Sequence, residues 1–235
     1  MTSPPRVLVI IPAHNEEESL PGTLAEVRAK APAVDILIVD DGSRDATSAV
    51  ARAHGVPVVR HPVNLGVGGA LQTGFRFAVE KGYDIGVQLD ADGQHDPFYL
   101  GVLLEPVLEG RCDVSIGSRY VTSTGYKAPL NRRMGMVLFS GVVKLASGRT
   151  ITDTTSGFRA YTRKVMEVCQ HDFPKDFPDA PLLITFARNG FRLLEVPVVM
   201  RERVAGQSFY TLGKQLYYPY KNLLASLMAL IRRPV

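Results

Sequence analysis

The sequence predicts an α/β protein with a mostly parallel central sheet flanked by helices. Short runs rich in valine and isoleucine alternate with segments whose apolar residues recur every three or four positions, the spacing of a helix. Strands that alternate with helices need crossover connections, and these produce parallel pairs. Polar clusters follow directly after several apolar runs, where open α/β sheets bind ligands. We therefore expect a Rossmann-like arrangement with its site at the carboxyl ends of the strands.

The first half of the chain supplies this alternation. Residues 7–11 form a continuous apolar run, which is typical of a strand covered on both faces, and helical spacing follows from Leu20 to Ala31. Asp96 before Pro97 is typical of a helix start, and Gly110 is typical of a helix end. The other predicted strands are 36–39, 56–60 and 85–89, and the other predicted helices are 46–54, 70–80 and the one that begins at Pro97.

The second half of the chain is less regular. We expect a strand at 114–117, a helix at 134–145, a polar turn at 153–159 before a short strand, and a strand or hairpin at 191–200. Residues 212–233 have an amphipathic helical pattern that Pro219 interrupts. Aromatic and leucine residues beside lysine and arginine suit binding at a membrane surface. Packing on the domain or on a dimer partner is the alternative for this segment.

Composition excludes several classes of protein. Hydrophobic residues make up 46% and charged residues 21% of the 235 positions, so a folded core is expected. The formal net charge of +4 fits a protein that handles phosphates or rests on an anionic membrane, and it is too weak to indicate a nucleic-acid partner. No apolar stretch approaches the ~20 residues of a spanning helix, and the start of the chain leaves no room for a signal peptide. The two cysteines lack metal spacing, so we expect a cytoplasmic protein, peripheral on the inner face of the membrane.

The acidic segment 90–95 gives the strongest chemical signal. Asp90 and Asp92 stand two residues apart at the end of a predicted strand, so both carboxylates can turn towards one site. Such oxygen ligands suit Mg²⁺ or Mn²⁺, with the phosphates of a substrate completing the coordination shell. A solvated turn is the simpler alternative. An EF-hand loop is disfavoured because Gly101 occupies the position that needs an acid.

Two further clusters follow the second and third predicted strands. Asp41 can accept a hydrogen bond from a nucleobase or a ribose, while Ser43 and Asp45 can cap the next helix. The glycine-rich turn at 64–70 lacks the third glycine of a dinucleotide fingerprint, because Leu71 stands there. Its glycines are expected to allow close packing and approach of the backbone to a ligand.

Arginines and one aspartate mark the loops of the second half. Arginine forms paired bonds to phosphate, so a convergent set suits a diphosphate leaving group. The loop 203–208 carries an arginine and a serine around a glycine and could close over such a ligand. Asp153 could orient an acceptor or act as a base, and capping of a turn is the alternative. The arginines are Arg119, Arg132, Arg133, Arg201 and Arg203.

Taken together, these segments resemble the family 2 glycosyltransferases, in particular the branch that makes polyprenyl- or dolichyl-phosphate sugars. The matching segments occur in the order of the family and span nearly the whole chain. They are 11–16, 40–43, 64–66, 90–95, 117–120, 156–159 and 203–208.

The resemblance implies one GT-A domain over residues 1–211, with a nucleotide-sugar-binding half at 1–118 and an acceptor half at 119–211. It implies a divalent ion held by Asp90, Asp92 and Gln94, and inversion at the sugar carbon. The catalytic residues would be Asp92 and Asp153. The residues that it places against the nucleotide sugar are Pro12, Ala13, His14, Glu16, Val39, Asp41, Asn64, Gly69, Asp90, Ala91, Arg119, Arg132, Arg203 and Ser208.

Three departures from the family pattern limit what can be carried over. His14 stands where the family usually has tyrosine, and Phe209 follows Ser208 where a basic residue is frequent. Around 177–181 the glutamate of related sequences has no counterpart. Identity of the acceptor is therefore open between a polyprenyl phosphate and a hydroxyl group on a soluble molecule or polysaccharide.

Two rival functions share parts of this pattern. A sugar nucleotidyltransferase would open with a glycine-rich basic loop after the first strand, and residues 12–16 do not have that composition. A non-catalytic sensor of sugar nucleotides could keep Asp41 and Asp90 but would have little use for Asp92, Gln94 and the arginines together. We therefore expect direct displacement of a nucleoside diphosphate, with metal and arginines stabilising the departing charge.

Overall fold

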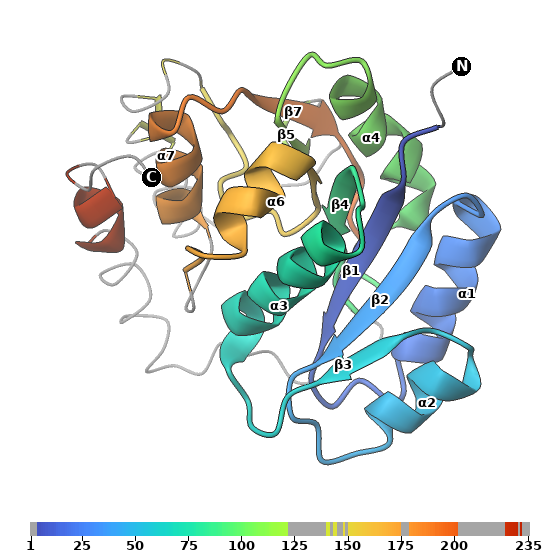
Figure 1. The fold of residues 1–235 in the computed structure, drawn as a ribbon. Helices are drawn as coiled ribbons and strands as arrows, with labels where there is room; N and C mark the ends of the chain where they lie inside the picture. The colour runs from blue at the N-terminus through green and yellow to red at the C-terminus, as the bar shows by residue number, and fades with distance from the viewer. Residues whose placement is uncertain are drawn as a thin grey trace.

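A single seven-stranded sheet forms the centre of the molecule (Figure 1). The structure is a computed structural model, and it describes residues 4–121, 140–141, 143–144, 148, 150–174, 179–201, 224–229 and 231. The strand order is β3-β2-β1-β4-β6-β5-β7. The strands are β1 (Val7–Ala13), β2 (Asp35–Asp40), β3 (Val58–Arg60), β4 (Ile85–Gln88), β5 (Val114–Ser118), β6 (Arg159–Thr162) and β7 (Leu193–Pro197).

Six of these strands run in one direction and β6 runs against them. Strand β1 pairs in parallel with β2 and β4, with Ile10 opposite Leu37 on one side and Gln88 on the other. Strand β6 is antiparallel to both β4 and β5, and β5 is parallel to β7. The prediction of a mostly parallel sheet is confirmed. The carboxyl ends of six strands consequently lie at one edge.

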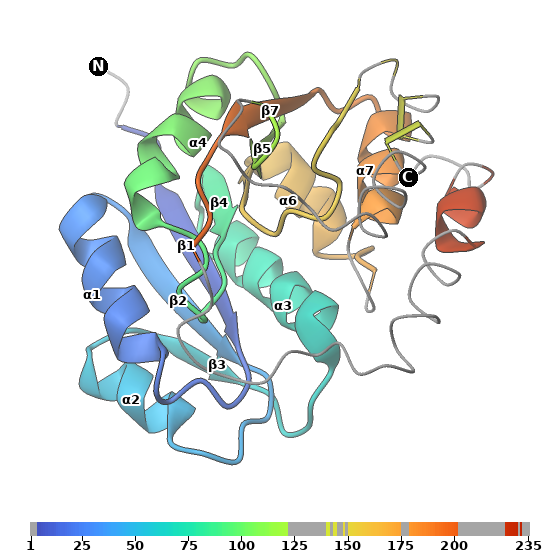
Figure 2. The ribbon, with the colours of Figure 1, turned by 180° about the vertical axis from the view of Figure 1, so that it is seen from behind.

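Helices cover both faces of the sheet, as the two opposite views show (Figures 1 and 2). Side chains alternate along a strand, so Leu8 and Ile10 enter one core layer while Val9 and Ile11 enter the other. The first layer is closed by α3 (Gly66–Glu80), α6 (Arg163–Cys169) and α7 (Ala180–Arg188). The second is closed by α1 (Leu20–Lys30), α2 (Thr47–Ala53) and α4 (Leu100–Leu108), which follows the short helix η1 (Pro97–Tyr99).

Most of the predicted elements are present, with ends shifted by a few residues. Residues 191–200 contain one strand, β7, and helices α6 and α7 were not predicted. Of the predicted helix at 134–145, residues 140, 141, 143 and 144 are described and are helical. Of the amphipathic segment 212–233, only 224–229 and 231 are described. Within the described part of the chain, no helix is both long enough and apolar enough to cross a bilayer.

The edge of the sheet opposite the predicted site is held by an ion cluster around Asp113. The buried carboxylate lies 2.6 Å from Lys164 Nζ and 3.2 Å from Arg192 Nε, and it accepts the Arg192 backbone N–H at 2.7 Å. Burial alone would raise the pKa of Asp113. The bonds from Arg192 and Lys164 outweigh it and lower the pKa from 3.8 to about 2.

We predict that Asp113→Asn reduces the free energy of unfolding at neutral pH by on the order of 2 kcal/mol. A carboxyl whose pKa is lowered by folding contributes stability above its unfolded pKa and loses it as the pH falls through the folded pKa. Urea unfolding should therefore give wild type a higher free energy of unfolding than the variant from pH 7 to pH 4. The difference between the two free energies should shrink towards pH 2. A gap that does not change with pH would contradict the assignment.

Candidate active site

The loops that follow β1 and β2 are joined into one surface at the carboxyl edge of the sheet. Asp41 donates its backbone N–H to the Ala13 carbonyl at 2.8 Å. His14 Nδ1 lies 2.8 Å from the Asp41 carbonyl, which can only accept, so the proton of this imidazole is on Nδ1. The backbone N–H of Asn15 donates to Ser43 Oγ at 3.0 Å. His14 therefore connects the two loops.

A second set of bonds fixes Glu16 at the same edge. Its backbone N–H donates to Thr47 Oγ1 at 2.9 Å, and its carboxylate accepts the Ser19 hydroxyl at 2.6 Å. Asp45 accepts the Thr47 backbone N–H at 3.0 Å at the first residue of helix α2, although the N-cap position itself is Ala46. Ser43 was also expected to cap this helix. Instead its hydroxyl accepts from the first loop.

Asp40 is a buried structural carboxylate. Its side chain accepts the Ser43 backbone N–H at 2.8 Å and the Ser48 hydroxyl, and Arg60 Nε lies 3.6 Å away. Burial raises the pKa of Asp40, but the bonds from Ser43 and Ser48 and the charge of Arg60 outweigh it, so the pKa falls below the usual value. The carboxylate is thus ionised at neutral pH and serves the turn after β2.

Asp41 holds the start of helix α3. Its Oδ1 accepts the Leu65 backbone N–H at 2.8 Å and lies 2.7 Å from His61 Nδ1, and its Oδ2 accepts the Gly66 backbone N–H at 2.8 Å. His61 Nε2 in turn lies 2.9 Å from Thr73 Oγ1 on α3. Three of about four acceptor positions are thus used, and the side chain is 5% exposed. His61 was not among the predicted site residues, although it follows strand β3 directly.

Gly42 lets the loop after β2 pack directly on the turn that precedes α3. Its φ is +72°, and a Cβ built there would lie 2.8 Å from the backbone carbon of Val63. Beside this contact, the Asn64 side chain accepts the Gly66 backbone N–H at 3.0 Å. Gly69 is buried in the first turns of α3 against Leu65. The glycine-rich segment therefore provides the close packing that was predicted for it.

We predict that Gly42→Ala costs about 1–3 kcal/mol of stability beyond the cost of Gly55→Ala, measured by urea unfolding. Gly55 is the matched control because its φ is +66° but a methyl group added there would meet nothing within 4 Å. Both variants carry the strain of a left-handed backbone, and only the first must also displace residue 63. Equal losses would show that the close approach does not matter.

The acidic turn after β4 has two carboxylates in different settings. Asp92 is buried and accepts the Gln94 backbone N–H at 3.0 Å, whereas the Asp90 side chain is 36% exposed. Thr23 of helix α1 donates its hydroxyl to the Ala91 carbonyl at 3.0 Å. In the described ranges, no three acidic, histidine or cysteine side chains gather closely enough to hold a metal ion. The carboxylate oxygens of Asp90 and Asp92 are hard donors that fit Mg²⁺ or Mn²⁺. Two carboxylates do not fill the coordination shell of such an ion, so a substrate would have to complete it.

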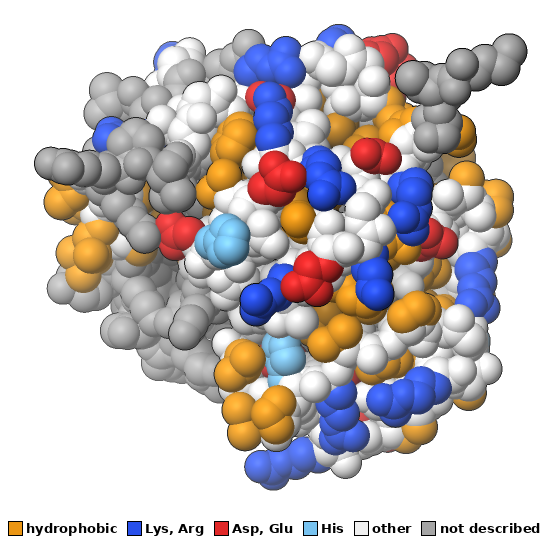
Figure 3. Space-filling view, in the orientation of Figure 1, with side chains coloured by type: hydrophobic (Ala, Val, Ile, Leu, Met, Phe, Trp, Pro, Cys, Tyr) orange, Lys and Arg blue, Asp and Glu red, His pale blue; other side chains and the backbone are white. Residues whose placement is uncertain are grey.

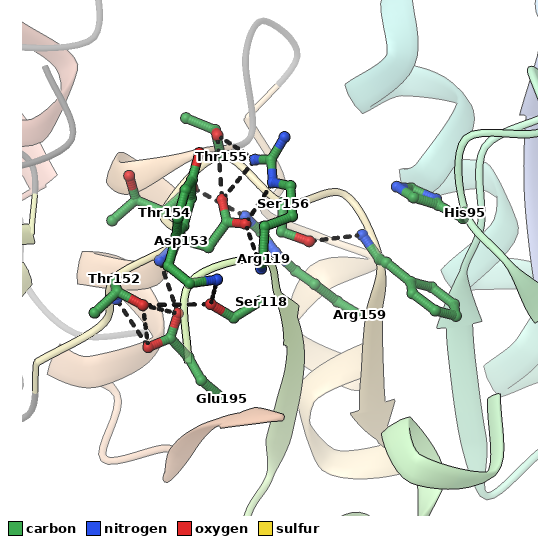
Figure 4. Close-up of polar contacts among 12 residues, drawn as sticks. His95, Ser118, Arg119, Thr152, Asp153, Thr154, Thr155, Ser156, Arg159 and Glu195 are labelled. Carbon is green, nitrogen blue, oxygen red and sulfur yellow. Dashed lines mark hydrogen bonds and ion pairs between the residues drawn. The ribbon is translucent and has the colours of Figure 1, made fainter. Parts of the chain in front are cut away.

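A buried ion pair joins the end of β5 to the turn before β6 (Figure 4). Asp153 is fully buried and faces the guanidinium of Arg119, with Nε to Oδ2 and Nη2 to Oδ1 both at 2.7 Å. The Arg119 backbone N–H at 3.2 Å and the Thr155 hydroxyl at 3.3 Å also donate to this carboxylate. These four bonds match the acceptor capacity of a carboxylate, which is about four.

Glu195 of β7 holds the backbone next to this ion pair. It accepts the backbone N–H groups of Thr152 at 2.8 Å and Asp153 at 2.7 Å, together with the Thr152 hydroxyl at 3.0 Å (Figure 4). This residue was not predicted from the sequence. Its signal was a single acid inside the otherwise apolar strand Leu193–Pro197. Because Glu195 fixes the backbone of Asp153, it also determines where the Arg119 guanidinium lies.

The remaining predicted residues are placed in three ways. Pro12 is half-buried at the end of β1, and Val39 is buried in the core, so only the backbone of Val39 can face a ligand. Arg201 makes ion pairs with Glu26 at 2.7 Å and Asp96 at 2.8 Å. Arg132, Arg133, Arg203 and Ser208 lie outside the described residues.

The fold and the acidic turn define the class of protein as a GT-A glycosyltransferase. The chain superimposes with a TM-score of 0.74 on glucosyl-3-phosphoglycerate synthase from Mycobacterium tuberculosis, crystallised with Mn²⁺ and UDP-glucose. The sequence identity is 20%, and the match covers 98% of this chain and 80% of the other. The model of glycosyl transferase family 2 matches residues 8–169, and the chain belongs to this family.

Two relatives with closer sequences are named for undecaprenyl phosphate and for polyprenol monophosphomannose. The undecaprenyl-phosphate mannosyltransferase of Micrococcus luteus is 39% identical over 214 residues, covering 86% of each chain. The polyprenol monophosphomannose synthase of Mycolicibacterium smegmatis is 37% identical over 216 residues, covering 86% of this chain and 80% of the relative. These matches confirm the resemblance to the branch that makes polyprenyl-phosphate sugars.

Proposed function

We propose that this glycosyltransferase transfers a sugar, with inversion, from a nucleoside-diphosphate sugar to a polyprenyl phosphate. The names of the two relatives favour mannose as the sugar. The donor would lie across the carboxyl ends of β1, β2 and β4, with Glu16 and the remaining acceptor position of Asp41 near the nucleoside. The reaction would occur at the cytoplasmic surface of a membrane, where such an acceptor lies.

The state of Asp153 carries this proposal. Transfer to a hydroxyl group needs a base with a lone pair directed at the acceptor proton. Asp153 is fully buried, and its four bonds to Arg119 and Thr155 use its acceptor positions. A phosphate acceptor is already anionic and needs no such base. The geometry therefore supports the lipid phosphate over the hydroxyl acceptor, and Asp153 would orient Arg119, whose charge would face a phosphate.

The acidic turn supports a role for a divalent ion. Asp90 and Asp92, with Gln94 beside them, would hold Mg²⁺ or Mn²⁺ against the phosphates of the donor. When bound, this ion would neutralise negative charge on the departing nucleoside diphosphate. The protein itself would keep the two carboxylates in place through the bond from Gln94 to Asp92 and the bond from Thr23 to the Ala91 carbonyl.

An exposed apolar segment beside the site supports a lipid acceptor. The loop between β3 and α3 exposes Val63 by 60% and Leu65 by 49%, and the first turn of α3 exposes Val67 by 42%. Apolar side chains gather in this region of the surface (Figure 3). Acidic and basic side chains are scattered over the central part of the face in that view. Three exposed branched side chains within five residues suit contact with an apolar chain or a bilayer.

The test of the proposed function is a comparison of two lipids that differ only in the phosphate group. With GDP-mannose, UDP-glucose or a dTDP-sugar as donor and Mn²⁺ present, radiolabelled sugar should pass to a polyprenyl phosphate and not to the matching polyprenol. Transfer to the polyprenol at a similar rate would contradict the proposal and would indicate that the acceptor is a hydroxyl group. Arg119→Ala should raise the KM for the phosphate acceptor.

We predict that Asp92→Asn lowers the rate of sugar transfer by roughly 100-fold or more, because stabilisation by a metal ion is worth several kcal/mol. Asp84→Asn is the matched control, since Asp84 precedes the same strand at the opposite edge of the sheet. The control should transfer sugar at the wild-type rate. A near-wild-type rate for Asp92→Asn with Mn²⁺ present would refute the metal assignment.

A further inference from the structure

His95 lies against the acidic turn and has no role in the proposed reaction so far. Its side chain is 4% exposed, and its Nδ1 accepts the backbone N–H of Asp90 at 3.0 Å. Strand β4 ends at Gln88, so the chain has left the sheet at Asp90. The imidazole therefore takes the place of a neighbouring strand as the partner of this N–H group, and it fixes the point at which the turn begins.

The same bond determines where the proton of His95 lies. A ring nitrogen that accepts an N–H carries no proton of its own, so the neutral imidazole is protonated at Nε2. Nε2 lies 3.7 Å from Asp90 Oδ2, which is too long for a direct hydrogen bond. The positive end of the Nε2–H dipole is nevertheless close to this carboxylate oxygen. One ring thus contacts both the backbone and the carboxylate of Asp90.

Packing holds the ring in this position. The His95 ring is stacked on Phe158, with the ring centroids 5.0 Å apart and the planes 13° from parallel. A Cβ built on Gly157 would lie 3.4 Å from His95 Cε1, 3.4 Å from Asp90 Oδ2 and 3.1 Å from Gln88 Nε2. The absence of a side chain at Gly157 lets the turn before β6 lie against His95 and Asp90.

The backbone around His95 is anchored as well. His95 forms an antiparallel bridge with Met200, and Gln94 accepts the Arg201 backbone N–H at 2.9 Å. Arg201 also pairs with Asp96 at 2.8 Å. Residue 95 is therefore held by the segment after β7, through Met200, and by the turn before β6, through Phe158. Its bond to the Asp90 N–H connects both segments to the acidic turn.

We propose that His95 is a positioning residue that sets the Asp90 carboxylate for binding a divalent cation together with a nucleoside diphosphate. It acts through Asp90 and does not contact the sugar or the acceptor. This inference rests on the proposed function, since it takes Asp90 as a ligand of the ion. Partners of metal ligands typically change metal affinity by 10–100-fold when they are replaced.

The test uses three substitutions that separate the features of the ring. His95→Phe keeps the stacking on Phe158 and removes both nitrogens. His95→Asn keeps an acceptor near Nδ1 for the Asp90 N–H and removes the Nε2–H group. His95→Gln places an amide near Nε2 and leaves the Asp90 N–H without its acceptor. His171→Asn is the control, because His171 is exposed at the end of α6, outside this turn.

The measurements are Mn²⁺ affinity in the presence of GDP or UDP, followed by electron paramagnetic resonance, and turnover as a function of Mn²⁺ concentration. We expect His95→Phe to weaken Mn²⁺ binding about 10–100-fold. His95→Asn should weaken it less, and the control should not change it. Saturating Mn²⁺ should restore most of the turnover of the His95 variants, because the ring does not touch the reacting groups.

Three outcomes would overturn the inference. Unchanged Mn²⁺ affinity in a folded His95→Phe protein would remove the positioning role alone and leave the proposed function intact. Turnover that stays low at saturating Mn²⁺ would show that His95 acts directly on substrate. Wild-type protein that binds no Mn²⁺ with either nucleotide would overturn the metal site of the proposed function, and this inference with it. If His95→Phe fails to fold, His95→Asn and His95→Gln carry the comparison.

Discussion

A carboxylate that leaves water must be compensated by hydrogen bonds, and this requirement shapes the loops at the carboxyl edge of the sheet. Asp41 draws together the end of β2, the turn at Leu65 and Gly66, and His61. Asp153 does the same for Arg119 and Thr155. Each buried acid thus connects segments that are far apart in the sequence. The surface that would receive a donor sugar nucleotide is built on these connections.

The acids at this edge differ in how far their side chains are exposed. Asp40, Asp41 and Asp153 are buried and bound by donors of the chain itself, so their charge serves mainly to hold the structure. The Asp90 side chain is partly exposed at the end of the central strand β4. Asp92, in the same turn as Asp90, is buried and accepts the Gln94 backbone N–H, so burial alone does not separate the proposed metal ligands from the structural acids. The bonds that occupy Asp153 favour the proposed acceptor, which brings its own negative charge.

Much of the site could be predicted because each strand of an α/β sheet delivers its next residues to the same edge. The positions of Asp90, Asp92, Asp41 and His14 follow from this rule once the apolar runs are recognised. Two supporting residues were not predicted. His61 and Glu195 each act through bonds to loops about 20 residues or more away in the sequence, and a local pattern carries no information about such partners.

By itself the sequence determined the class of fold, the place of the acidic turn and the family. These depend on periodicity, on turn residues and on motif order, which are local properties of the chain. Only the tertiary structure decided that β6 runs against its neighbours and that Asp153 is closed off by Arg119. It also showed that the His95 ring accepts the Asp90 backbone N–H. Burial and bond geometry arise only when distant segments pack, and they determine whether a carboxylate is a base, a ligand or a structural support.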